Sequence, residues 1–290
     1  MKKIHALSLA AVLLLAPIAP VSDDLPLASV VHAAAQQDTI KEYTRPAKTS
    51  ADKDKERSVE APVPWLLVED HRIEALNANG KCVTYSSHPV LHVKGKGRET
   101  LSRALDAWNK HEAQAAKKGF DFAYKCKNGD RQGGFLEDIA YFDYSVITKW
   151  GRVDESMISF CSFGAEFTGG IHPMHGEGGT TFDAKTGKEV PLAAIVTSRE
   201  ALLRALATAF LTQYPDREED LFAYDIEEQL ERFHTPKKGL NIKSWYMGTR
   251  GELVFLYPPY ALGPYSSGDF TLTIERADAP ELFTDAYPLK

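Results

Sequence analysis

Apolar residues follow several short alternating runs and a few stretches with helical spacing. Two strands are predicted in PVPWLLVEDHRIEAL and CVTYSSHPVLHV, and the turn signal Asn79-Gly80 between them predicts a hairpin. In RETLSRALDAWNKHEAQAAKK, residues 98–118, the side chains of Leu101, Leu105 and Trp108 share one helical stripe with charges elsewhere. This spacing predicts an amphipathic helix laid on a sheet.

The second half of the chain repeats this alternation of strands and helices. AYFDYSVITKW and SMISFCSFGAEFTGG are predicted to pair, and GTTFDAKTGKEV adds a strand with a turn around 183–187. Thr197 and Glu200 form a capping-box pattern that opens a second helix, which Pro215 ends. A third, acidic helix is predicted from Ile226 to Phe233. The strands LVFLY and FTLTIE close the chain.

The order of these elements predicts the fold class. Strands follow one another directly, and helices lie between groups of strands rather than after every strand. This order is typical of an α+β fold with a mainly antiparallel sheet and amphipathic helices packed on it, and it argues against a Rossmann-like α/β fold. No internal repeat of fixed period is present.

The first 62 residues are predicted to lie outside this fold. Lys2 and Lys3 precede the apolar run ALSLAAVLLLAPIA, and the small-residue site HAAA follows, which is typical of a secretory signal. We expect residues 1–35 to be a signal peptide cleaved near Ala35, with an uncleaved anchor as the alternative. Residues 36–62 are polar and charged, and we expect a disordered tether before order begins near Val63.

Composition and charge restrict the partners. The expected signal segment carries two lysines and two aspartates, so the remaining chain keeps the net charge of -6. A mildly acidic protein gives no support to nucleic acid or an anionic membrane as a partner. The chain is 43% hydrophobic and 10% aromatic, which is enough for a core, and no later segment is long enough to span a membrane.

Three cysteines lie in the exported part, which allows at most one internal disulfide from three possible pairs. Cys161 falls on the apolar face of a strand, so we expect it to be a buried thiol. Cys82 and Cys126 lie beside turn residues, where two segments can meet near the surface. We therefore favour a disulfide between Cys82 and Cys126.

The glycine-rich segment FTGGIHPMHGEGG, residues 167–179, is the sharpest candidate for metal chemistry. His172, His175 and Glu177 could supply two imidazoles and a carboxylate to a metal ion. The simpler alternative is a structural His172 and a solvent-facing His175. The sequence contains no H-E-x-x-H helix and no C-x-x-C motif.

The segment YPPYALGPYSSG, residues 257–268, is a stiff aromatic loop after the strand LVFLY. Tyr257 continues the alternation of the strand and is expected in the core. Of Tyr260 and Tyr265, we expect one to anchor the loop and the other to be exposed. If the exposed ring contacts a ligand, the two loops that follow strands of one sheet should supply the binding residues: Gly169, Gly170, His172, Tyr260 and Tyr265.

Signatures of catalysis are absent from the sequence. There is no G-x-S-x-G nucleophile motif, and the glycine-rich segments lead into strands rather than opening a helix that could bind phosphate. Acidic pairs such as Glu227 and Glu228 are more simply the solvated face of a helix. The motifs favour binding over turnover, and no catalytic residue or cofactor is expected.

Several of these segments resemble a known family. The order TGGIHP, TTFDAKTGKEVPLAAIV, an amphipathic helix, LVFLYPPYALGPYSSG and FTLTIE, within about 138–275, resembles the bacterial envelope family DUF3298. The hairpin and helix before it, about 65–118, resemble the companion domain that usually precedes this family. We therefore expect a companion domain at 63–137 and a DUF3298-like domain at 138–290.

The resemblance implies an extracytoplasmic α+β module without catalytic residues. Relatives include the lysozyme-binding part of an anti-sigma factor and the noncatalytic front of a peptidoglycan deacetylase. The resemblance implies a secreted or periplasmic binding module of the cell envelope for a cell-wall glycan, another wall component, or a protein such as an envelope protein or lysozyme. The alternatives are a metal-dependent hydrolase using His172, His175 and Glu177, and a structural or assembly protein of the envelope.

Overall fold

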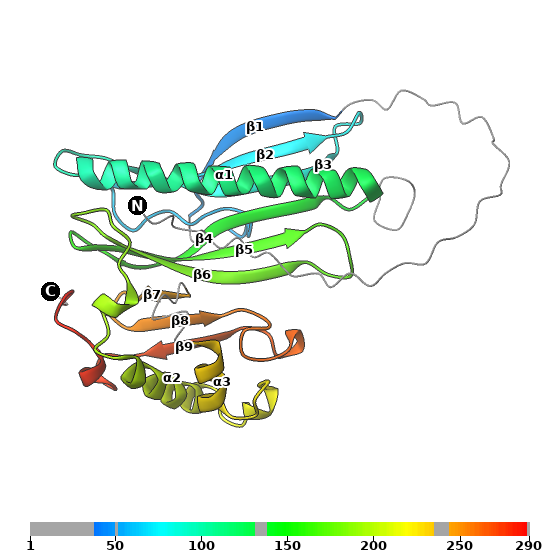
Figure 1. The fold of residues 1–290 in the computed structure, drawn as a ribbon. Coiled ribbons are helices and arrows are strands. Elements are labelled where there is room, and N and C mark those ends of the chain that lie inside the picture. The colour runs from blue at the N-terminus through cyan, green and yellow to red at the C-terminus, as the bar shows by residue number, and fades with distance from the viewer. Residues whose placement is uncertain (1–37, 50–51, 131–137, 235–243, 289–290) are drawn as a thin grey trace, which may run out of the picture.

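The computed structural model describes residues 38–49, 52–130, 138–234 and 244–288, and these form four layers (Figure 1). Helix α1 covers one face of a six-stranded sheet, and a three-stranded sheet packs against the opposite face. Helices α2 and α3 cover the far side of the small sheet. The expected signal peptide and its cleavage site near Ala35 lie outside the described residues.

The large sheet has the strand order β1-β2-β3-β4-β5-β6. Its strands are β1 (Thr39–Pro46), β2 (Leu66–Leu76), β3 (Cys82–Val93), β4 (Tyr141–Val153), β5 (Met157–Phe167) and β6 (Met174–Asp183). Neighbouring strands are antiparallel except β3 and β4, which are parallel. The α+β prediction is confirmed, with a sheet that is mixed but mainly antiparallel. This sheet runs across the domain boundary expected at residues 137 and 138.

Helix α1 (Glu99–Asp130) connects the two parallel strands β3 and β4. A parallel pair needs such a crossover, because a short turn can join only antiparallel neighbours. The helix buries the predicted residues Leu101 and Leu105, and it extends beyond the predicted end at 118. The extension places Phe120 and Ala123 against the sheet, where both are buried.

The small sheet consists of β7 (Trp245–Met247), β8 (Leu253–Tyr257) and β9 (Phe270–Ile274), all antiparallel. It packs on α2 (Arg199–Gln213) and α3 (Ile226–Phe233). The capping prediction is wrong by one residue. The N-cap of α2 is Ser198, whose side chain accepts a hydrogen bond from the Ala201 backbone nitrogen, while the Thr197 hydroxyl donates to the Glu281 carbonyl.

The two sheets meet closely along β5, β6 and β7. The Ser159 hydroxyl accepts a 2.8 Å hydrogen bond from the Met247 backbone nitrogen. A Cβ atom at Gly179 would lie 1.9 Å from the Trp245 carbonyl oxygen, so only glycine fits there. Strand β5 is therefore buried on both faces, with Phe160 toward α1 and Cys161 toward the small sheet.

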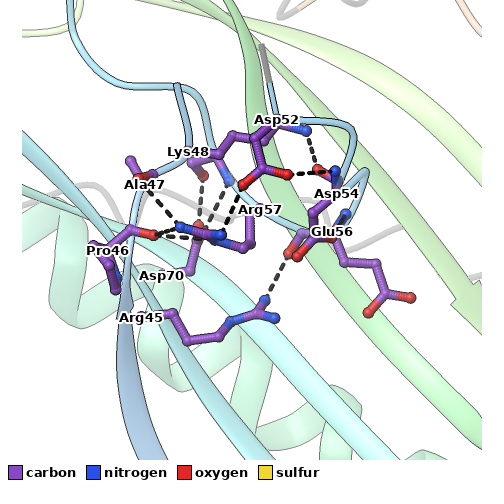
Figure 2. A network of polar contacts seen from close by, with 10 residues as sticks. Arg45, Pro46, Ala47, Lys48, Asp52, Asp54, Glu56, Arg57 and Asp70 are labelled. Carbon is purple, nitrogen blue, oxygen red and sulfur yellow. Dashed lines mark hydrogen bonds and ion pairs between the residues drawn. The ribbon is translucent and has the colours of Figure 1, made fainter. Parts of the chain in front are cut away.

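The disordered tether expected at 36–62 is wrong for the described residues 39–49 and 52–62. Residues 39–46 pair with β2 as strand β1, and the segment after it folds back onto the sheet (Figure 2). Arg57 donates to the Pro46 carbonyl at 2.7 Å, and Asp70 accepts from the Ser58 backbone nitrogen at 2.8 Å and from its hydroxyl at 2.5 Å. Polar bonds to the sheet hold this segment together with a few apolar contacts of Ala47, Val59 and Ala61, so its mainly polar composition was misleading.

Candidate functional site

Two loops that are far apart in the sequence meet at one end of the sheets. The His172 ring, in the loop 168–173 after β5, stacks on the Tyr265 ring in the loop 258–269 after β8. Their centroids are 4.3 Å apart and their planes are 29° apart. The Tyr265 hydroxyl also donates to the Pro173 carbonyl at 3.4 Å. The two loops lie side by side, but they do not follow strands of one sheet as predicted, because β5 belongs to the large sheet and β8 to the small sheet.

Gly169 and Gly170 have φ angles of 105° and 101°, which residues with a side chain rarely adopt. They form the turn that carries the chain from β5 toward His172. Ile171, next to them, is fully exposed. The structure thus gives the glycines a backbone role at the edge of the loop pair, and ligand contact by either glycine remains a prediction.

Tyr257, at the end of β8, and the two tyrosines of the second loop differ in burial as predicted. Tyr257 is 1% exposed, and its hydroxyl shares a 2.9 Å hydrogen bond with Nε2 of His234. Tyr265 is half-buried and anchors the loop through its stack on His172. Tyr260 is 52% exposed and has a positive φ of 68°. Tyr257 is therefore the core residue, Tyr265 is the anchor of the loop and Tyr260 is the exposed ring.

The three proposed metal ligands do not share one loop. Residues 174–183 form strand β6, so His175 and Glu177 lie on a strand while His172 lies in the loop before it. Nε2 of His175 lies 3.6 Å from the Asp269 carboxylate, whereas His172 stacks on Tyr265. Within the described ranges, no group of three or more His, Cys, Asp or Glu side chains is placed to hold a metal ion. The loop placement expected for His175 and Glu177 is wrong.

A line of aromatic rings crosses the large sheet and ends at this loop pair. Neighbouring rings lie between 4.3 and 6.3 Å apart along this line. We call it the aromatic row, and it consists of Tyr85, Phe142, Tyr144, Phe163, His175, Tyr265, His172 and Tyr260. Tyr85 is buried, the next five rings are half-buried, and the last two are exposed. The row therefore becomes more accessible toward the loops.

Strand register explains why these rings line up. Tyr85 pairs with Phe142 across β3 and β4, and the side chains of alternate residues on a strand point to one face. Alternating aromatics in YFDY and SFCSF are visible in the sequence. Their alignment depends on the register, which sequence reasoning did not supply.

Charged groups border the buried end of the row. The Arg72 guanidinium lies 3.8 Å from the centroid of the Tyr85 ring, whose hydroxyl donates to Glu56 at 2.6 Å. Burial raises the pKa of the Tyr144 hydroxyl, and the negative charges of Glu56 and Asp54 raise it further. Burial is thus the main cause of the raised pKa of Tyr144, and the charges of Glu56 and Asp54 add to it.

A second acidic region lies near the exposed end of the row. Glu177 is the cross-strand partner of Phe163 and is half-buried. Burial raises the pKa of its carboxyl group, and the charge of Asp269 raises it further. Burial, with a smaller contribution from Glu177, also raises the pKa of the neighbouring Cys161 thiol to about 12. Cys161 is 3% exposed, which confirms the predicted burial and makes the thiol unreactive.

Cys82 and Cys126 are both half-buried, one at the start of β3 and one on α1. No disulfide joins them in the part of the chain that the structure describes. The Cys82 sulfur instead lies 3.5 Å from the Thr84 carbonyl, as a weak hydrogen-bond donor within its own strand. The favoured disulfide is therefore not formed in this structure.

Comparison with known proteins supports the family resemblance. Residues 193–277 match the family described as a protein of unknown function, DUF3298. The TGGIHP segment and the turn at 183–187 precede the matched range. No curated protein sequence matches the chain.

Two solved structures of DUF3298 family proteins are similar to the chain. One, from Pseudomonas aeruginosa PAO1, is 13% identical with a TM-score of 0.45, and the match covers 88% of this chain and 96% of that one. The other, from Bacteroides fragilis NCTC 9343, is 12% identical with a TM-score of 0.48, covering 87% and 96%.

Proposed function

Because residues 193–277 form a region of the DUF3298 family, we propose that this protein is a noncatalytic binding module of the bacterial cell envelope. In this proposal the protein is exported and works in secreted or periplasmic form. Its ligand is a cell-wall component or a wall-active protein such as lysozyme. The binding surface is the loop pair, 168–173 and 258–269, with the exposed end of the aromatic row. In the described residues no helix is long and apolar enough to cross a membrane.

The main support for the proposal is the exposure and the backbone conformation of Tyr260. Its ring is 52% exposed, so it adds little to the core, and its φ of 68° is a conformation that costs roughly 1 to 2 kcal/mol for a residue with a side chain. Strained residues cluster at binding sites, because the surrounding structure holds them in place for a purpose other than stability. The Tyr260 ring lies 5.7 Å from the Tyr265 ring, which stacks on the exposed His172. Aromatic rings of this kind give a large contact area at low entropic cost.

A binding screen tests the proposal. The exported protein is mixed with insoluble peptidoglycan, with soluble peptidoglycan fragments and with lysozyme, each with and without a chelator. We expect saturable binding to one of these ligands that the chelator does not change. Tyr260→Ala should weaken it at least about tenfold, the scale of an aromatic hot spot. Phe122→Ala is the matched control, since Phe122 is 58% exposed on α1, on the other side of the large sheet.

Each result of the screen has a defined meaning. Equal binding by the wild type and Tyr260→Ala would remove the loop pair from the binding surface. Binding to other envelope proteins in a pull-down, with none to wall fragments or lysozyme, would favour a structural or assembly protein. Stoichiometric zinc together with loss of function in chelator would favour the metal-dependent hydrolase.

A further inference from the structure

Three large aromatic side chains are exposed on two neighbouring loops at one end of the small sheet. Phe222 and Tyr224 lie in the loop 214–225 between α2 and α3, where Phe222 is 50% and Tyr224 is 74% exposed. The third is Tyr260 in the loop 258–269 (Figure 1). A single exposed ring is ordinary, but three on adjoining loops are typical of a surface that contacts another molecule.

The two loops are bonded to each other and to the core. The Phe222 backbone nitrogen donates to the Leu262 carbonyl at 3.0 Å, and the Ser267 hydroxyl donates to the Asp220 carbonyl at 2.9 Å. Leu262 is itself fully buried in the small-sheet core. Rings on such a support are held in place before a partner arrives, which lowers the entropy cost of binding.

The charge of the chain is concentrated around these rings. The segment 214–233, which comprises the loop 214–225 and α3, carries eight carboxylates and two arginines. Its net charge of -6 equals the net charge of the whole sequence. Three exposed carboxylates of this segment have no ion-pair partner within the described residues: Asp216, Glu219 and Glu227. The exposed rings are therefore bordered by negative charge.

A buried amide beside the same loops has an unused acceptor. Gln229 of α3 is 5% exposed, and its Nε2 donates to the carbonyl of Ala261, the residue after Tyr260, at 3.3 Å. Its Oε1 has no hydrogen-bond donor within the described ranges. An acceptor in this state costs free energy, so it favours a ligand that brings N–H donors, as lysine and arginine do.

From these observations we propose that Phe222, Tyr224 and the unpaired carboxylates of the segment 214–233 form an interface for a cationic segment of a partner protein. The inference rests on the proposed function, because it extends the binding surface from Tyr260 to the neighbouring loop and names the charge of the ligand. Aromatic residues bordered by charged residues are typical of the energetic part of a protein interface. Opposite charge on the partner speeds association and fixes its orientation.

The negative charge argues against other occupants of this surface. An anionic wall polymer or an anionic lipid surface is repelled by it. A neutral saccharide gains nothing from the carboxylates. A second copy of the chain brings the same negative charge to the same place.

Lysines of the chain itself are the internal alternative. Lys237 and Lys238 follow the segment in the sequence and lie outside the described residues. The double variant Lys237→Gln/Lys238→Gln shows whether they neutralise the carboxylates. Peptide binding that is seen only in this variant would overturn the inference.

The test uses the full exported chain and peptides of unbiased sequence. A displayed library of short random peptides is selected on the wild type, and the affinities of the selected peptides are measured at low and high salt. The aromatic variants are Phe222→Ala and Tyr224→Ala, and their control is Phe122→Ala on α1. Thermal melts of each variant confirm that it folds.

The charge variant and its control differ only in the place of the carboxylates that they remove. Each neutralises three exposed carboxylates that have no ion-pair partner within the described ranges. The charge variant is Asp216→Asn/Glu219→Gln/Glu227→Gln, and the control is Glu42→Gln/Asp106→Asn/Glu281→Gln.

We expect the selected peptides to be rich in lysine and arginine. Phe222→Ala, Tyr224→Ala and the charge variant should each weaken their binding at least about tenfold, and both controls should bind as the wild type does. The loss in the charge variant should be largest at low salt, where charges are screened least.

Four other results would overturn the inference. Selected peptides without net positive charge would contradict the cationic partner. Unchanged affinity in Phe222→Ala and Tyr224→Ala would remove the rings from the interface, and equal losses in the two triple variants would mean that binding follows overall charge. Binding of anionic vesicles, wall fragments or a second copy of the chain that is lost in Tyr224→Ala would assign the surface to that occupant.

The outcomes for this interface and for the proposed function are distinguishable. Cationic peptides that depend on Tyr224 and on the carboxylates support the interface, even if neither wall fragments nor lysozyme bind in the first screen. Conversely, a ligand in that screen whose binding depends on Tyr260, but not on Tyr224 or the carboxylates, supports the proposed function and rejects the extended interface.

Discussion

The two sheets of this protein are stabilised by different means. The small sheet packs on α2 and α3 through one apolar cluster that includes Leu206, Phe210, Phe255 and Leu272, all fully buried. The large sheet has its apolar residues divided among several smaller clusters. Between them it buries polar side chains: Asp70, Arg72, Thr84, Ser86, Ser87 and His88.

Several of these buried polar atoms have no protein partner within the described ranges. Examples are the Ser86 hydroxyl and Nδ1 of His88, and Nδ1 of the neighbouring, half-buried His71 is in the same state. Burial, together with His71, lowers the pKa of His88 to about 4, so its ring is neutral at pH 7. Unless a water molecule satisfies them, such groups cost about 1 to 3 kcal/mol each. The small sheet is therefore stabilised mainly by apolar packing. The large sheet buries polar side chains at a cost in stability, and it carries the aromatic row.

The largest expected effect tests the scaffold. Tyr257→Ala removes a fully buried ring from the small-sheet core together with its hydrogen bond to His234, and should lower the free energy of unfolding by about 3 to 5 kcal/mol. Denaturant unfolding of the purified protein measures this. Tyr260→Ala should change it by less than about 0.5 kcal/mol. Similar losses in both variants would contradict the separation of core and exposed tyrosines.

The second largest effect tests the packing between the two sheets. Gly179→Ala places a methyl group 1.9 Å from the Trp245 carbonyl, and backbone cannot move aside as a flexible side chain can. We expect a loss of about 3 kcal/mol, or failure to fold. Its control is Gly178→Ala, one residue earlier, where a Cβ meets nothing within 4 Å. Thermal melts that place the two variants together would show that the sheets do not pack as described.

Ser58 tests the polar means of stabilising the large sheet. Ser58→Ala leaves the buried Asp70 without one hydrogen bond, and the Ile147 backbone nitrogen without its 2.9 Å bond to the same hydroxyl. The expected cost is about 1 to 3 kcal/mol. Limited proteolysis should also cut the segment 52–62 faster in this variant than in the wild type. Rapid cutting of this segment in both proteins, at the same rate, would instead support a disordered tether.

The smallest effect has the opposite sign. Burial, followed by the charge of Glu166, raises the pKa of Asp143 from 3.8 to about 6. The native protein therefore holds a proton between about pH 4 and pH 6 that the unfolded chain has lost, so stability falls as pH rises through this window. Asp143→Asn removes this penalty, and should stabilise the protein at pH 7 by about 1 to 2 kcal/mol after allowance for solvent screening.

Unfolding midpoints measured from pH 4 to pH 8 show this change. The wild type should lose stability across the window, and the Asp143→Asn profile should be flatter. Asp106→Asn, on the exposed side of α1, is the control and should follow the wild type. A variant less stable than the wild type at pH 7 would mean that the buried carboxylate contributes to stability.

Local patterns predicted much of the secondary structure. Asn79-Gly80 lies in the hairpin turn between β2 and β3, and the pair β4 and β5 forms where alternation predicted it. Strand β1 and the length of β6 were missed, because charged or glycine-rich residues carry no strand signal and gain their order from pairing with a neighbour. For the same reason, His175 and Glu177 were predicted as metal ligands in a loop, although they lie on strand β6.

The sequence by itself determined which residues are candidates for the core and for the exposed loops, since alternation, turn residues and apolar spacing act over a few neighbours. It thereby placed Tyr257 inside and brought attention to His172 and Tyr265. Only the tertiary structure decided that rings from distant strands form one row, and that His175 and Glu177 lie on a strand beside it. Both depend on strand register and on how two sheets pack, which arise from contacts between segments far apart in the sequence, such as Ser159 with Met247 and His172 with Tyr265.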